Sequence, residues 1–130
     1  TTFGGHPAAC VAATVTIDVM RRDRIPERAA RQGAKALKRV KEWEGLPIVG
    51  ETRGLGLAIG VEIVSDKAAK TRDAETARDV FFDCVHNGVI PLYDTEMNVL
   101  RIQPPLTIED DLLAKALDVM EAALRKHSRG

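Results

Sequence analysis

The chain is organised around one stretch, Asn98-Val99-Leu100-Arg101-Ile102-Gln103-Pro104-Pro105-Leu106-Thr107. It has the pattern of a short strand that is stopped by two prolines and carries one arginine inside it. Side chains alternate between the two faces of a strand. Leu100 and Ile102 are therefore expected on one face, and Val99 and Arg101 on the other.

Arg101 stands between apolar neighbours, where a guanidinium is costly to bury unless an anionic group meets it. Its planar, forked donors match a carboxylate with two parallel hydrogen bonds. Two interpretations are open on this evidence. Arg101 receives the carboxylate of a small-molecule ligand, or it forms an internal ion pair, for instance with Glu62.

The composition is that of an ordinary globular domain. The chain has 130 residues, of which 45% are hydrophobic and 29% charged, enough for one compact domain. Lys+Arg and Asp+Glu both number 19, so no net basic charge attracts nucleic acid or a membrane surface. No apolar run approaches the roughly 20 residues that span a bilayer, and we recognise no signal peptide. Cys10 and Cys84 lie on the apolar sides of expected helices, which favours free buried thiols and a cytoplasmic location.

Hydrophobic periodicity predicts a small α+β domain. Helices are expected over residues 8–22, 26–44 and 73–87 and after Thr107, which is a plausible N-cap. Strands are expected at residues 48–53, 57–64 and 89–92 and in the stretch that contains Arg101. This order of elements is typical of a mostly antiparallel sheet with helices over one face.

Three motifs follow one another along the chain. They are Thr2-Phe3-Gly4-Gly5-His6-Pro7-Ala8-Ala9-Cys10, then Arg53-Gly54-Leu55-Gly56-Leu57-Ala58-Ile59-Gly60-Val61-Glu62, then Leu100-Arg101-Ile102-Gln103-Pro104-Pro105-Leu106-Thr107. In this order and at this spacing they resemble segments of the class III, fold-type I, pyridoxal-phosphate aminotransferases. The resemblance spans the whole chain, which corresponds to about the last third of a family member.

The resemblance implies roles for two residues. The threonine that matches Thr2 hydrogen-bonds the phosphate of pyridoxal 5'-phosphate in the neighbouring subunit's active site, so it also implies a homodimer or higher homo-oligomer. The arginine that matches Arg101 binds the substrate carboxylate. Four glycines are carried over only as residues that shape the backbone: Gly4, Gly5, Gly54 and Gly56.

The resemblance also implies that part of the catalytic machinery is missing. The family's chemistry needs a lysine that forms a Schiff base with the cofactor and an aspartate that pairs with its pyridine nitrogen, and both lie upstream of the Thr2 segment. We therefore expect no catalytic residue and no metal site in these 130 residues, which should be inactive alone. Residues 1–22 are expected to be a loop and helix leading from a large cofactor-binding domain, and residues 23–130 to be the small C-terminal α+β domain.

The chain is therefore interpreted as the C-terminal part of a cytoplasmic aminotransferase that moves an amino group from an amino donor to an oxo acid. A decarboxylating or isomerising member of the same family is the near alternative. A non-catalytic α+β ligand-binding or dimerisation module is the alternative from another class, supported by the short length and the missing lysine. The expected helix over residues 8–22 argues against the module, because it is apolar nearly all round and a lone domain would leave it partly exposed.

Overall fold

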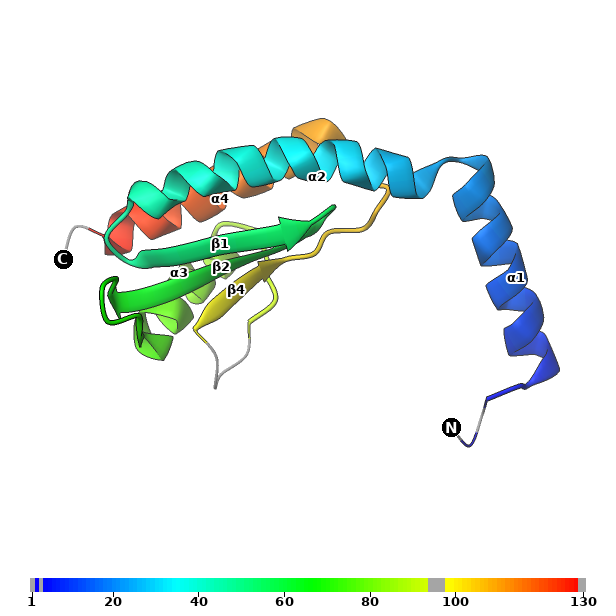
Figure 1. Ribbon diagram of the computed structural model, residues 1–130, viewed down its shortest axis with the longest axis horizontal. Coiled ribbons are helices and arrows are strands. Elements are labelled where there is room, and N and C mark those ends of the chain that lie inside the picture. Colours follow the sequence, from blue (N-terminus) through cyan, green and yellow to red (C-terminus); the bar gives the residue numbers. More distant parts are fainter. Residues whose placement is uncertain (1, 3, 94–97, 129–130) are drawn as a thin grey trace.

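Strand β2 is the centre of an antiparallel sheet, in which it pairs with β1 along one edge and with β4 along the other (Figure 1). The computed structural model describes residues 2, 4–93 and 98–128. Its elements, in order, are α1 (Pro7–Arg22), α2 (Ile25–Glu42), the 3₁₀ helix η1 (Trp43–Gly45), β1 (Val49–Leu55), β2 (Ala58–Asp66), β3 (Thr71–Arg72), α3 (Ala74–His86), β4 (Val99–Ile102) and α4 (Asp110–His127). The predicted α+β class is confirmed.

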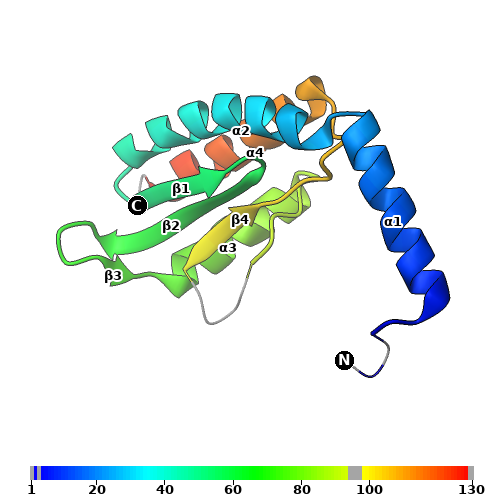
Figure 2. The ribbon, with the colours of Figure 1, turned by 45° about the vertical axis from the view of Figure 1, so that its right-hand side comes forward.

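The core lies between this sheet and the helices α2, α3 and α4 (Figure 2). Alternate residues of β2 are buried, and Ile59, Val61 and Ile63 all point into the core, as the period of two predicts. From β4, Leu100 and Ile102 are buried on the same side. The opposite face of the sheet carries the charged side chains that are described below.

Helix α2 buries the face predicted from periodicity, with one exception. The pattern Ala30, Gly33, Leu37 and Val40 favours these residues as the buried stripe. Gly33 and Val40 are buried and Leu37 packs against the core, but Ala30 is exposed and Ala29 is buried instead. Arg39 on the same helix holds α4 through Asp118 at 2.7 Å and Glu121 at 2.9 Å.

Three other local predictions are corrected by the structure. Helix α4 begins at Asp110 with Glu109 as N-cap, so Thr107 does not cap it. Residues 89–92 contribute one isolated bridge, from Leu92 to Arg101, instead of a full strand. The loop expected after Ser65 contains the short strand β3.

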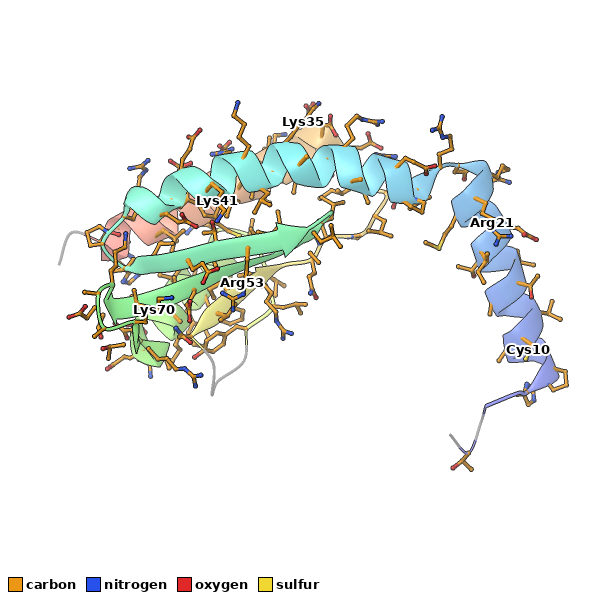
Figure 3. All side chains as sticks on the ribbon, in the orientation of Figure 1. Cys10, Arg21, Lys35, Lys41, Arg53 and Lys70 are labelled. Carbon is orange, nitrogen blue, oxygen red and sulfur yellow. The ribbon has the colours of Figure 1, made fainter. Side chains whose placement is uncertain are left out.

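Helix α1 extends away from the rest of the domain (Figures 1 and 2). It contacts α2, and none of its residues is buried. Cys10 is therefore exposed on α1 (Figure 3), contrary to the expectation of a buried thiol. Cys84 on α3 is buried, as expected.

Two glycines place α2 against the turn between β1 and β2. Gly56 has a positive φ of 55°, a left-handed conformation that glycine adopts readily. Gly33 of α2 faces this turn, and a Cβ at Gly33 would overlap the backbone carbonyl group of Gly56. Gly56 thus shapes the backbone at a point where α2 approaches it closely.

The carboxylate of Glu44 ties η1 to β1. It accepts hydrogen bonds from the backbone N–H of Thr52 at 2.7 Å and from the Thr52 hydroxyl at 2.6 Å, and it pairs with Lys41 at 2.9 Å. These bonds, that of the Thr52 hydroxyl first, lower the pKa of Glu44 from 4.5 to about 2. They also satisfy Thr52, which is fully buried in β1.

We predict that Gly33→Ala destabilises the fold by about 1–3 kcal/mol, because α2 must move away from the turn to admit a methyl group. Urea unfolding followed by circular dichroism measures the change. Gly45→Ala is the matched control, since a Cβ at Gly45 would meet nothing within 4 Å. Equal stability of the two variants would contradict the close contact.

We also predict that the stability contributed by Glu44 depends on pH. A carboxyl group with a lowered folded-state pKa stabilises the fold fully above its ordinary value of 4.5, and this contribution is lost as the pH falls toward about 2. Glu44→Gln should therefore be less stable than the parent at pH 7 and should approach it near pH 2. Urea unfolding at a series of pH values tests this, and a stability difference independent of pH would argue against the Glu44 bonds.

Candidate functional site

Arg101 is fixed in the middle of a paired strand. On one side it lies opposite Gly60 of β2, and on the other its backbone N–H and carbonyl both bond to Leu92 at 2.9 Å. The flanking residues Leu100 and Ile102 are 0% and 6% exposed, so they anchor the strand in the core. The Arg101 side chain points to the other face and is exposed. The prediction that it lies opposite the apolar pair is confirmed.

A second arginine lies across the same face. Gly60 pairs with Arg101 on β4 and with Arg53 on β1, so the two arginines flank one glycine (Figure 3 labels Arg53). A hollow of about 390 Å³ lies over this part of the sheet. Its lining residues are Arg53, Gly54, Ala58, Ile59, Gly60, Val99, Arg101 and Gln103. With no side chain at Gly60, nothing on β2 separates Arg53 from Arg101.

Glu62 was a candidate partner of Arg101, but the structure pairs it with Arg53. The Glu62 carboxylate lies 3.7 Å from the Arg53 guanidinium, and Glu51 lies 3.8 Å from it. Glu62 and Arg101 are both among the described residues, and no ion pair joins them. Glu62, the example given for an internal ion pair of Arg101, is therefore the wrong partner.

Thr2 lies in an exposed turn before α1, at the end of the chain that is far from β4 (Figures 1 and 2). The chain therefore does not bring Thr2 and Arg101 together. No side chain caps the start of α1, and no acidic residue lies in its first turn. Gly5 has a φ of 79°, and a Cβ there would meet nothing within 4 Å. The start of α1 thus presents open backbone N–H groups, which attract anions.

Asp83 belongs to a cluster of charged side chains that joins α3 to the end of α4. Asp83 of α3 accepts from His127 at 2.6 Å and from Lys126 at 2.8 Å, and these bonds, that of Lys126 first, lower the pKa of Asp83. Within residues 2, 4–93 and 98–128, no group of three His, Cys, Asp or Glu residues could hold a metal ion. No helix in the same ranges is long and apolar enough to cross a membrane.

Sequence reasoning missed the alignment of Arg53, Gly60 and Arg101. The signal was present, because the turn at Gly56 and Leu57 joins β1 and β2 with Leu55 opposite Ala58. Counting back from that turn places Arg53 opposite Gly60. The register of β4 has no such local signal, because it depends on contacts between residues distant in the sequence.

Comparison with known proteins identifies the family. The model of the family described as aminotransferase class-III matches residues 1–124. The chain belongs to this family. It is 38% identical over 130 residues to a leucine/methionine racemase of Thermococcus litoralis, which is 99% of this chain and 29% of the racemase. It is also 38% identical over 120 residues to an acetylornithine aminotransferase of Methanothermobacter thermautotrophicus, which is 92% of this chain and 28% of that enzyme.

Solved structures support the same assignment. A Bacillus anthracis aminotransferase matches 97% of this chain with a TM-score of 0.86 and 32% identity, over 30% of its own length. The resemblance of the three motifs to class III aminotransferases is thus confirmed. The chain spans less than a third of the length of these relatives.

Proposed function

We propose that the chain is the C-terminal part of a pyridoxal-phosphate-dependent aminotransferase, which moves an amino group from an amino donor to an oxo acid. The observation that carries the proposal is the exposed guanidinium of Arg101 on the open face of the sheet, held in place by a buried strand. Membership of the class III aminotransferase family supports the reaction class.

Arg101 binds the substrate carboxylate in this proposal. Its strand is bonded on both sides, so the backbone that carries the guanidinium is already ordered before a substrate binds. Glu62, which shares this face of the sheet, is engaged by Arg53. A carboxylate from outside the chain is the group that the forked donors fit best.

Thr2 and the start of α1 hold the phosphate of the cofactor. Their chemistry fits this role, because the threonine is exposed, the helix start is uncapped and Gly5 leaves the approach open. When bound, pyridoxal phosphate supplies the electron sink that amino-group transfer requires. In this proposal the lysine that binds the cofactor covalently lies outside these 130 residues, in a large domain. Residues 1–22 connect that domain to the small domain, residues 23–130.

The complete protein is a homo-oligomer in which Thr2 serves the partner subunit. Helix α1 supports this arrangement, because Val11 is 64% exposed and Val15 is 55% exposed in the isolated chain. A second subunit would bury these apolar side chains. Because Thr2 and Arg101 lie far apart in one chain, we propose that they serve the active sites of different subunits. We also infer a cytoplasmic location, supported by the two unbridged cysteines.

A second candidate reaction is amino-acid racemisation, which the 38% identity to the leucine/methionine racemase favours. Leucine, methionine and acetylornithine all carry a carboxylate. The proposed role of Arg101 is therefore the same for either reaction. Incubation of the full-length protein with one amino acid and no oxo acid separates the two, because only a racemase then inverts the substrate continuously.

We predict that Arg101→Ala in the full-length protein lowers kcat/KM for carboxylate-bearing substrates by about 10- to 100-fold, the size of a lost charged hydrogen bond. Amines without a carboxylate should lose far less. Steady-state kinetics with one carboxylate-bearing substrate and one amine without a carboxylate measures this. Arg78→Ala is the control, because Arg78 is an exposed residue of α3. Equal losses for both kinds of substrate would count against the assignment, as would unfolding of the variant.

We further predict where the cofactor is attached. Borohydride reduction in the presence of pyridoxal phosphate should add one cofactor mass to the full-length polypeptide and no specific mass to the 130-residue chain. Intact mass spectrometry distinguishes the two. One stoichiometric adduct on the 130-residue chain would show that the lysine lies within it, and no adduct on either would refute the cofactor.

A further inference from the structure

Glu62 lies between two arginines on the open face of the sheet. Its direct neighbour on β4 is Val99, and Arg101 is two residues further along β4, in a diagonal position. On β1, Arg53 is also a diagonal neighbour of Glu62, because Arg53 lies opposite Gly60, as Arg101 does. Diagonal neighbours on one sheet face are about 7–8 Å apart, within reach of long side chains. Either arginine can therefore take the Glu62 carboxylate.

The structure shows which arginine takes it. Arg53 lies 3.7 Å from Glu62 and 3.8 Å from Glu51, so both carboxylates gather on the β1 side of the sheet. The Glu62 side chain is 21% exposed and that of Arg53 is 54% exposed. Glu62 is partly shielded from water, which strengthens its attraction to Arg53 relative to a fully solvated pair. Arg101, on the β4 side, does not share Glu62.

We propose that Arg53 is a positioning residue that holds Glu62 away from Arg101 and so leaves Arg101 able to bind the substrate carboxylate. This inference rests on the proposed function of Arg101. Arg53 acts through Glu62 and makes no contact with the substrate in this proposal. Removal of the Arg53 charge leaves Glu62 with Arg101 as its other diagonal cation. Glu62 then competes with the substrate carboxylate for the same guanidinium.

The absence of a side chain at Gly60 is what makes this competition possible. A Cβ there would already meet Val99 at 3.3 Å, and a larger side chain would stand between Arg53 and Arg101, which both lie opposite Gly60. Because no side chain rises from Gly60, rotation of the Glu62 side chain is enough to move its carboxylate from Arg53 to Arg101, and the sheet need not move. The expected effect is on substrate binding, since the reacting groups are untouched.

The experiment compares four variants of the full-length protein: Arg53→Gln, Arg53→Lys, Glu62→Gln and the double variant Arg53→Gln/Glu62→Gln. Arg53→Gln should raise KM for a carboxylate substrate by about 2- to 5-fold, the size of one partly exposed ion pair, with kcat unchanged. KM for an amine without a carboxylate should not change. Arg53→Lys keeps the charge and should keep KM low.

The double variant decides the mechanism. If Glu62 is the competitor, its neutralisation restores KM although Arg53 is still absent, and a purely structural role of Arg53 would give no such rescue. A double variant that stays at the KM of Arg53→Gln overturns the inference, because Arg53 then acts by its own charge or by stabilising the fold. The inference is also overturned if Arg53→Gln alone raises KM equally for the carboxylate substrate and for the amine.

Arg101→Ala in the same assay separates this inference from the function on which it rests. If that variant discriminates between the carboxylate and the amine while the double variant shows no rescue, the inference alone fails. If Arg101→Ala does not discriminate, the proposed role of Arg101 fails and the inference fails with it. Circular dichroism of each variant confirms that the fold is retained, and half-exposed Arg53 tolerates glutamine on a sheet surface.

Discussion

The antiparallel register that places Gly60 opposite both Arg53 and Arg101 is the constraint on which the rest of the structure depends. Side chains alternate faces along a strand, so a shift of β4 by one residue would bury Arg101 and expose Leu100. The fold and the candidate site are therefore fixed by the same pairing. Burial of Leu100 and Ile102 on one face keeps the guanidinium on the other.

Two contacts outside the sheet secure this register. Gly33 and Gly56 bring α2 onto the turn between β1 and β2, where a side chain at Gly33 would not fit. Glu44 then fastens the chain after α2 to Thr52 of β1. Together they align β1 from both ends, and through its pairing with β2 they place Arg53 opposite Gly60. The site is thus positioned by backbone geometry, with the charged side chains added on the exposed face.

The sequence predicts what local patterns control. The alternation along β2, the extent of α1 and the face of Arg101 all follow from periodicity, and the structure confirms them. Contacts between distant segments were not predictable, so the choice of Glu62 between Arg53 and a partner on β4 required the structure. Cys10 was misjudged for a related reason. An apolar helix was assumed to be covered, yet nothing in the described part of this chain covers α1.

Under the proposed function, one face of the sheet serves stability and the other serves substrate binding. Truncation of a side chain on the buried face lowers the stability of the fold strongly, by about 2–5 kcal/mol when a buried leucine such as Leu100 is replaced by alanine. Ion pairs on the open face are long, at 3.7 and 3.8 Å, and exposed pairs of this kind contribute roughly 0–1 kcal/mol. The ion-pair partners on the open face, among Arg53, Glu62 and Arg101, can therefore change with little loss of fold stability. The proposed contact of Arg101 with a substrate carboxylate can therefore be altered by substitutions on this face while β4 stays in place.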